Sequence, residues 1–501
     1  EMKEVELNEM DQEKQPMTGE TPTGTEKNGS VKVKVPEDAE VKFTGLSKEE
    51  LMKVAGTAGW VRTRWALLVL FWLGWVGMLA GAIVIIVQAP RCKPIPEMHW
   101  WNEGPLYQIS NLDAFSKNGL KGVEEKLDYL SQMKVKGLVL GPVHSVQADQ
   151  SSALELTSIN PDFGSESELT SLLDRAHRKG ISIVLDLTPN YRGVSSWFNN
   201  AASVAEKLKK ACVYWLNKGV DGIFLSDLND IVNTYAWSSI QAIFNKTDGT
   251  PKKALMGSVN SMSINDISVL LNRSGVDLLL TGQPDLSDSG EKQAQIIKEF
   301  NSSIQQTSLG WRSRQDPGTL AAEFPIRLYQ ILLFTLPGTP VFSAGEELGL
   351  KAEAIHKYSS CELIAVLIIN VNLSTEFCSF HHLLIQALQE ERLAVRNFFK
   401  TLSDLRGKER SLQHGEYVGL SNSKSSLAFL RVWDQSKRFI TALNWGDKPV
   451  TMKLTYRDLP AEAQVLLSTD TSSLALESMV SVEKLQLDPK QAVLLTYSYA
   501  G

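Results

Sequence analysis

The feature that most constrains this chain is an uninterrupted run of apolar or small residues at positions 65–87, which contains no charged or hydroxyl side chain. As a helix, the run would be about 35 Å long, slightly more than the roughly 30 Å hydrocarbon core of a bilayer. A core helix of this length would normally carry a polar stripe, which is absent here. The run starts too late and is too long for a cleaved signal peptide. The sequence therefore predicts one transmembrane helix at 65–87.

Basic residues near the two ends of this run predict its orientation. Four lie within 45–64 and two within 88–107, namely Lys48, Lys53, Arg62 and Arg64 before the run and Arg91 and Lys93 after it. Because basic residues favour the cytosolic side, we expect residues 1–64 in the cytosol and 88–501 outside the cell. This is the type II, single-pass topology, with the segment acting as a signal anchor.

Four Asn-x-Ser/Thr triplets lie in the region predicted to be outside, at Asn245, Asn272, Asn301 and Asn372. Such triplets accept N-linked glycans in secreted domains. We expect glycosylation at Asn245 and Asn301 above all. The prediction supports the orientation, because glycans are added only on the outer side.

The predicted cytosolic tail, residues 1–64, contains 13 acidic and 10 basic residues and few aromatic ones. This composition is typical of a disordered segment. One local exception is Ser47, which is followed three residues later by Glu50. That spacing predicts a capping box at the start of a short helix.

The outer region alternates short apolar segments with amphipathic ones. The expected strands are 106–110, 135–143, 181–189, 221–227, 254–259, 276–282 and 340–345. Between the first two, Leu120, Val123, Leu127, Leu130 and Met133 have the spacing of one helix face. This alternation predicts a parallel sheet, most simply a (β/α)8 TIM barrel. After about Ser411, short strands at 427–433, 438–444, 450–455 and 492–497 predict a separate antiparallel β-sandwich domain.

Composition and charge exclude several functional classes. The chain has 501 residues, ordinary globular composition and a net charge of −6, so nothing indicates nucleic-acid binding. Cys92, Cys212, Cys361 and Cys378 are too few for a disulfide-built scaffold. The seven histidines show no metal-ligand spacing, and we expect no metal and no cofactor.

Three segments of the outer region resemble motifs of the α-amylase family. Residues 186–191 are similar to that family's Asp-x-x-x-Asn-His strand end, and residues 219–226 to its Gly-x-Asp-Gly-Phe-Arg-x-Asp motif. Residues 336–349 are similar to its last barrel strand and the loop that follows. The three motifs occur in the family's order. The resemblance therefore implies the amylase-type barrel and its C-terminal β domain.

A narrower resemblance covers most of 42–350 and 400–501. Residues 60–65, 89–92 and 185–193 are similar to the heavy subunits of heteromeric amino-acid transporters. That resemblance implies a partner, a light chain of many membrane helices, which the heavy subunit stabilises and brings to the plasma membrane. It also implies an added adhesion or signalling role through integrin β subunits.

Cys92 is the residue that we expect to link the two subunits by a disulfide. It lies five residues beyond the apolar run, so at most about 18 Å of extended chain separates it from the membrane. An exposed thiol in an oxidising compartment tends to pair. Cys212 lies in a helical pattern at 201–217 and is expected to be a buried small residue.

The amylase-type chemistry is expected to be absent. Retaining hydrolysis needs two carboxyl groups, a nucleophile and an acid/base. Matched residue by residue, the nucleophile position holds Ser226, the preceding arginine position Phe224, and the acid/base position Ser258. The family's histidine after Asn190 is Tyr191. Asp186 is retained, whereas Asp227 lies one residue after the nucleophile position and would point to the opposite face of a strand.

Two further departures from the family pattern affect the expected domains. About 30 residues separate Asn190 from Asp221, which leaves no room for the insertion that walls the sugar cleft. Residues 351–395 also depart, either as an alternative exon or gene-model error or as a divergent loop with a buried strand. The predicted domains are a tail at 1–64, a membrane helix at 65–87, a neck at 88–99, a barrel at 100–410 and a β domain at 411–501.

Three functions remain open from the sequence. The first is a non-catalytic transporter heavy chain, in contact with the lipid bilayer and a light chain through Cys92 and the membrane helix. The second is an active α-glucosidase. The third is an adhesion or signalling scaffold that acts with integrins.

Overall fold

The computed structural model describes residues 47–89, 92–198, 201–245, 251–259, 263–282, 286–312, 325–350 and 376–499. These residues divide into two compact units, Glu1–Arg91 and Cys92–Gly501. The predicted features at Cys361, Asn372 and 363–371 lie outside the described residues, and so does the side chain of Cys378.

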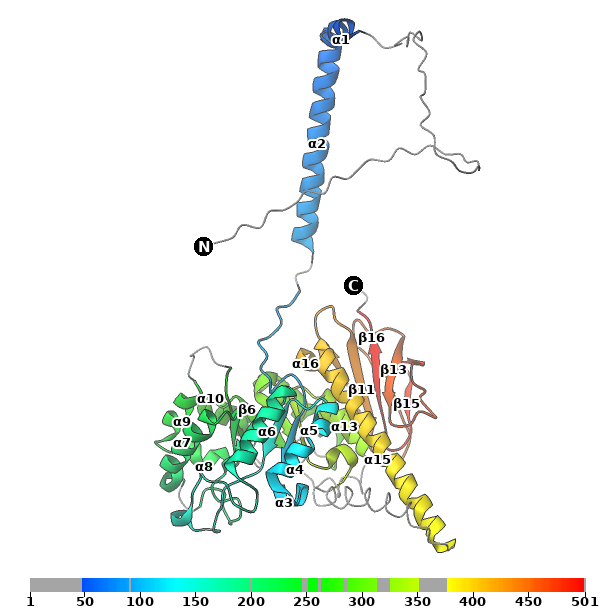
Figure 1. Cartoon of the computed structure of the whole chain (residues 1–501). Helices are drawn as coiled ribbons and strands as arrows, with labels where there is room; N and C mark the ends of the chain where they lie inside the picture. Colours follow the sequence, from blue (N-terminus) through cyan, green and yellow to red (C-terminus); the bar gives the residue numbers. More distant parts are fainter. Residues whose placement is uncertain are drawn as a thin grey trace, which may run out of the picture. The chain divides into compact units, whose positions relative to one another are not determined.

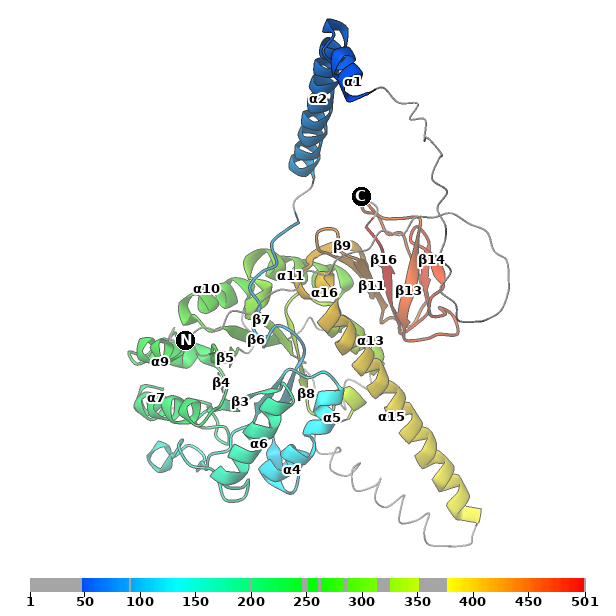
Figure 2. The same cartoon turned by 45° about the horizontal axis from the view of Figure 1, so that its top comes forward.

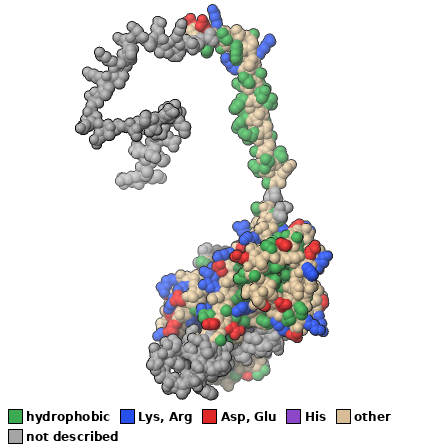
Figure 3. All heavy atoms as spheres, turned by 90° about the vertical axis from the view of Figure 1, so that its right-hand side faces the viewer, with side chains coloured by type: hydrophobic (Ala, Val, Ile, Leu, Met, Phe, Trp, Pro, Cys, Tyr) green, Lys and Arg blue, Asp and Glu red, His purple; other side chains and the backbone are tan. Residues whose placement is uncertain are grey.

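The first unit contains two helices, α1 (Lys48–Ala55) and α2 (Ala58–Gln88). The predicted capping box is present: the Ser47 hydroxyl accepts from the Glu50 N–H, and the Glu50 carboxylate accepts from the Ser47 N–H. Apolar side chains cover α2 on the face seen in Figure 3. With 31 residues and none of its most apolar stretch buried, α2 is the one described helix that is long and apolar enough to cross a membrane. It starts seven residues before the predicted run.

The second unit contains a closed barrel of eight parallel strands, which confirms the predicted barrel (Figures 1 and 2). The strands are β1 (Leu106–Ile109), β2 (Gly137–Leu140), β3 (Ser182–Asp186), β4 (Gly222–Leu225), β5 (Ala254–Ser258), β6 (Leu278–Gly282), β7 (Leu309–Arg312) and β8 (Thr339–Ser343). Nearly all their residues are buried, as expected for parallel strands covered on both faces. Strand β7 was not among the predicted strands.

Helices surround the barrel (Figure 2). They are α3 (Leu112–Phe115), α4 (Gly119–Glu125), α5 (Leu127–Gln132), α6 (Glu166–Arg178), α7 (Ala202–Asn217), α8 (Leu228–Val232), α9 (Trp237–Phe244), α10 (Ile264–Ser274), α11 (Gly290–Ser303) and α13 (Ile326–Thr335). The helix face predicted from Leu120 to Met133 is divided between α4 and α5 at Lys126, and Met133 lies just beyond α5. Cys212 is fully buried in α7, as predicted.

Helices α15 (Glu376–Lys408) and α16 (Arg410–His414) precede the antiparallel β domain. Its six-stranded sheet has the order β14-β13-β16-β11-β10-β9, and β12 pairs with β15 beside it. Side chains from both sheets share one apolar core. The bounds are β9 (Glu416–Ser423), β10 (Ser426–Val432), β11 (Arg438–Asn444), β12 (Val450–Met452), β13 (Glu462–Ser468), β14 (Met479–Ser481), β15 (Leu485–Leu487) and β16 (Gln491–Tyr497). The sequence predicted four of these eight strands.

The barrel and the β domain are joined around α13, which is buried from Leu328 to Thr335. The buried Arg431 of β10 donates to Thr335 O at 2.6 Å and to Gly415 O at 2.8 Å. The buried Arg406 of α15 donates to Phe334 O at 2.6 Å and to Leu336 O at 3.2 Å. Both guanidinium groups therefore satisfy carbonyl groups at the end of α13.

The barrel and the β domain also come into close backbone contact at the start of α11. A Cβ atom on Gly290 would lie 2.1 Å from Ser426 O and 2.3 Å from Ser423 O. Only glycine permits this approach between α11 and the turn that connects β9 to β10.

The chain enters the barrel at the amino-terminal ends of its strands. Trp101 is buried there among the inward-facing side chains of the strands. Asn102 donates to Thr307 O at 2.7 Å, just before β7, and to the Thr339 hydroxyl at 3.3 Å, at the start of β8. Residues 101–102 therefore anchor the end of the neck to this side of the barrel.

The hydrogen bonds of Arg431 to the carboxyl end of α13 can be tested by substitution. Arg431→Met should lower the free energy of unfolding by about 3 kcal/mol, because it removes the donors and leaves buried carbonyl groups unsatisfied. Chemical denaturation followed by tryptophan fluorescence measures the change. Arg457→Met is the matched control, since the Arg457 side chain is 80% exposed. Equal midpoints for Arg431→Met and the unsubstituted chain would contradict this role of Arg431.

Candidate functional site at the carboxyl ends of the barrel strands

Enzymes with a (β/α)8 barrel carry their active sites at the carboxyl ends of the strands. In this chain the neck reaches the barrel at the amino-terminal ends of the strands, so the carboxyl ends lie on the other side of the barrel. The residues predicted to replace catalytic groups lie near or just after the carboxyl ends of β3, β4 and β5, so they belong to this end of the barrel.

Asp186 ends β3 and is 7% exposed. Its carboxylate accepts hydrogen bonds from the N–H of Thr188 at 2.8 Å and from the Thr188 hydroxyl at 2.5 Å. Burial raises the pKa of Asp186 to about 6, while the Thr188 hydrogen bonds and the charge of Arg312 act in the opposite direction. Burial thus disfavours the charged form of this carboxyl group.

Thr188 connects the ends of β3 and β4. Its hydroxyl donates to Asp186 and accepts from the N–H of Ser226 at 3.0 Å. The carbonyl of Ser226 accepts from the indole N–H of Trp197 at 2.9 Å. Ser226, which was predicted to stand at the nucleophile position of the family motif, is therefore held through its backbone N–H and carbonyl groups.

Asp227 lies beyond the end of β4 with a left-handed φ of 49° and precedes α8. Its carboxylate accepts from the Ser196 hydroxyl at 2.5 Å, and its carbonyl accepts from Trp197 at 3.0 Å. Asp227 was predicted to be the last residue of a strand at 221–227 and to face away from Ser226. The strand has already ended at Leu225, so the alternation of a strand does not set its direction.

Arg312, at the end of β7, links the two aspartates electrostatically. Burial lowers the pKa of Arg312, whereas the charges of Asp227 and Asp186 act to raise it. Arg312 was not among the residues predicted for the site. A basic residue that directly follows the apolar strand residue Trp311 was the available signal.

Phe224 and Ser258 are the remaining residues that were predicted to replace catalytic groups. Phe224 is 1% exposed and packs among the inward-facing apolar side chains of the barrel. Ser258 ends β5 and is also 1% exposed, and its hydroxyl has no hydrogen-bond partner among the described residues. At these two positions, the structure places a packed ring and a buried hydroxyl group.

Tyr191 stands where the family has a histidine. Its hydroxyl donates to His144 O at 2.8 Å, and the two rings meet edge to face with centroids 5.2 Å apart. Burial lowers the pKa of His144 to about 4, so this imidazole is neutral at physiological pH. Tyr191 therefore ties the loop after β3 to the segment after β2.

The remaining predicted site residues lie elsewhere. Cys92 is exposed at the start of the neck segment. Asn245 and Asn272 are exposed, on the carboxyl end of α9 and on α10, and Asn301 is partly exposed on α11. Within the described residues, no group of three or more His, Cys, Asp or Glu side chains could hold a metal ion.

Comparison with solved structures gives the fold class. A debranching enzyme from Nostoc punctiforme matches with a TM-score of 0.60 and 17% identity, over 81% of this chain and all of that one. An α-amylase from Geobacillus thermoleovorans matches with a TM-score of 0.57 and 17% identity, also over 81% of this chain and all of that one. Identities this low show the shared amylase-type fold alone.

Comparison of sequences gives the family. The family model described as solute carrier family 3 member 2 N-terminus matches residues 30–107, and the α-amylase catalytic domain matches residues 108–244. The amino acid transporter heavy chain SLC3A2 of Rattus norvegicus is 42% identical over all of this chain and 98% of its own length. SLC3A1 of the same organism is 23% identical over 98% of this chain and 91% of its own length. The chain belongs to the SLC3A2 family of amino acid transporter heavy chains.

Proposed function

We propose that this chain is the non-catalytic heavy subunit of a heteromeric amino-acid transporter. In this role it stabilises a light chain of many membrane helices and brings it to the plasma membrane. The observation that supports this most is the likeness to SLC3A2 heavy chains along the whole chain, apolar helix included. The predicted boundaries at 64, 87, 99 and 410 belong to this proposal.

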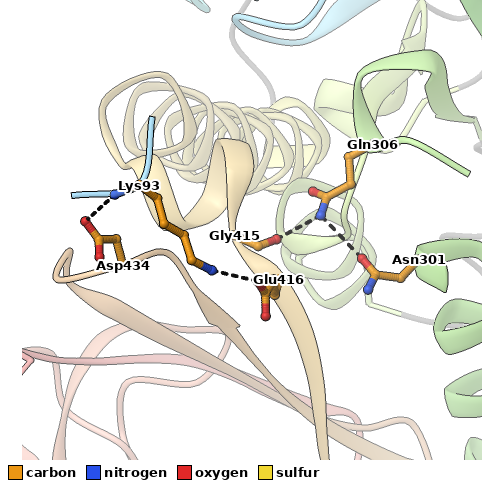
Figure 4. Close-up of polar contacts among 6 residues, drawn as sticks. All are labelled: Lys93, Asn301, Gln306, Gly415, Glu416 and Asp434. Carbon is orange, nitrogen blue, oxygen red and sulfur yellow. Dashed lines mark hydrogen bonds and ion pairs between the residues drawn. The ribbon is translucent and has the colours of Figure 1, made fainter. Parts of the chain in front are cut away.

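Helix α2 is the proposed membrane anchor. The excess of basic residues before it favours a cytosolic N-terminus. In that orientation the barrel, the β domain and all four Asn-x-Ser/Thr triplets are extracellular. The amide nitrogen of Asn301, the atom to which a glycan is attached, points away from Gln306, which instead donates to the Asn301 oxygen at 3.3 Å (Figure 4).

The barrel is proposed to lack glycosidase activity. A serine at the nucleophile position cannot form the glycosyl ester that retaining hydrolysis requires, and a serine at the acid/base position cannot protonate the leaving group at neutral pH. The two nearby aspartates, Asp186 and Asp227, are each held by a hydroxyl donor. By sequence, an α-amylase from Bacteroides thetaiotaomicron matches only 20% of this chain, whereas the SLC3A2 heavy chain of Rattus norvegicus matches all of it.

We expect the purified chain to hydrolyse 4-nitrophenyl α-glucoside no faster than buffer does. Loss of the nucleophile and the acid/base removes several orders of magnitude from the rate. Release of nitrophenolate, followed by absorbance, is the measurement. Turnover that is abolished by Asp227→Asn and unchanged by Asp447→Asn would make Asp227 the nucleophile and contradict the proposal; Asp447 is 89% exposed and serves as the control.

Glycosylation tests the orientation. Asn245→Gln and Asn301→Gln should each increase the mobility of the chain on a denaturing gel, because each removes one glycan from the extracellular part. Asn233→Gln is the control, since Asn233 is exposed and not part of such a triplet. Identical mobilities before and after enzymatic removal of N-glycans would place residues 88–501 on the cytosolic side.

The proposed covalent link to the light chain uses Cys92. When both subunits are expressed together, Cys92→Ser should eliminate the high-mass species that reducing agents dissociate. Part of the complex should still copurify in mild detergent, because packing between the subunits remains. Cys212→Ala should retain the species, since Cys212 is fully buried. A reducible species that survives Cys92→Ser would move the bridge to another cysteine.

A further inference from the structure

The part of the neck that belongs to the second unit, residues 92–99, is held at both of its ends. Its far end is anchored by Trp101 and Asn102 at the amino-terminal side of the barrel. Its near end is anchored by Lys93, the residue directly after Cys92. Figure 4 shows Lys93 between two acidic side chains of the β domain.

Lys93 makes three contacts with the start of the β domain. Its N–H donates to the Asp434 carboxylate at 3.2 Å, and its ammonium group forms an ion pair with Glu416 at 2.9 Å. The ammonium nitrogen also lies 6.0 Å from the ring centroid of Trp433. Backbone and side chain of one residue are thus bound to the start of β9 and to the turn between β10 and β11.

The acceptors of Lys93 are themselves held in place. Gly415, which directly precedes Glu416, accepts hydrogen bonds from the buried Arg431 and, at 3.0 Å, from Gln306 (Figure 4). Trp433 packs against His414 with ring centroids 5.3 Å apart. Glu416, the partner of Lys93, therefore directly follows a residue whose carbonyl is bound by both Arg431 and Gln306. These hydrogen bonds restrict the backbone at that point.

Exposure limits how strongly the ion pair alone can act. The Lys93 and Glu416 side chains are 54% and 64% exposed, so salt screens their attraction. Pro94 and Pro96 restrict the backbone that follows and lower the entropy lost on docking. The three contacts and the two prolines together favour a docked neck.

We propose that Lys93 is a positioning residue that holds Cys92 at the edge of the β domain, where a thiol of a membrane partner can reach it. This inference rests on the proposed function, because it concerns the same interchain disulfide. Formation of that bond removes two protons and two electrons from the two thiols, and a disulfide-bonded oxidoreductase of the secretory compartment accepts them and becomes a dithiol. Lys93 takes no part in the electron transfer and determines only how often the thiol is in position.

A nitroxide spin label on Cys92 tests the docking without a light chain. The full-length chain in lipid nanodiscs carries Cys361→Ser and Cys378→Ser, while burial raises the pKa of the Cys212 thiol to about 12 and keeps it unreactive. We expect a motionally restricted spectrum. Lys93→Glu should lower the ratio of restricted to free label about fivefold, and Lys93→Glu/Glu416→Lys should restore it. Raising the salt concentration should free the label of the unsubstituted chain as well.

Lys484→Glu is the matched control, because it makes the same charge change after β14, at the opposite edge of the sheet from β9. A label whose mobility is the same in Lys93→Glu and in the control would overturn the proposal. Coexpression with a light chain gives the second readout: Lys93→Glu should slow formation of the reducible species, and the charge-swapped variant should recover it. The expected mobility pattern without any reducible species would instead contradict the Cys92 link in the proposed function.

Discussion

The relation between the barrel and the β domain depends on two buried arginines that bind backbone carbonyl groups. Arg431 and Arg406 cap the carboxyl end of α13 and the segment that leads into β8, where a helix leaves its last carbonyl groups without partners. Burial lowers the pKa of both groups, and for Arg431 the charge of Arg406 lowers it further. The hydrogen bonds must therefore offset a considerable desolvation cost. Through Gly415, the same joint supports the residues that bind Lys93.

The two ends of the barrel differ in the residues that they carry. At the carboxyl ends lie the residues predicted to replace catalytic groups. Phe224 and Ser258 are buried, and the backbone N–H of Ser226 donates to the Thr188 hydroxyl. At the amino-terminal ends, Trp101 is buried among the side chains inside the barrel, and the neck ends there. In the proposed function, the amylase-type fold is a rigid extracellular body, and the carboxyl end of its barrel carries out no glycosidase chemistry. The proposed contacts with the light chain are made by the neck and by α2.

Strong periodic patterns explain which features could be predicted from the sequence. Seven barrel strands were found because buried parallel strands are continuous apolar runs, and the Ser47 capping box because its spacing is local. Strand β7 (Leu309–Arg312) was missed because Gly310 and Arg312 interrupt it, so it lacks the continuous apolar run that marks the other barrel strands. In the edge strands β9 and β14 only Tyr417 is buried, and both strands lack the apolar alternation that the prediction used. The conformation of Asp227 and the partners of Arg312, Arg431 and Lys93 depend on residues distant in the sequence, which no local pattern records.

We propose that this chain functions as the partner of a membrane protein with many helices. The most direct measurement is isolation of the native chain from membranes in mild detergent, followed by non-reducing and then reducing electrophoresis. The released band is then identified by mass spectrometry. The account predicts a second protein with many hydrophobic helices, released by reduction in equal amount to this chain. Recovery of this chain alone, or linked only to further copies of itself, would contradict it.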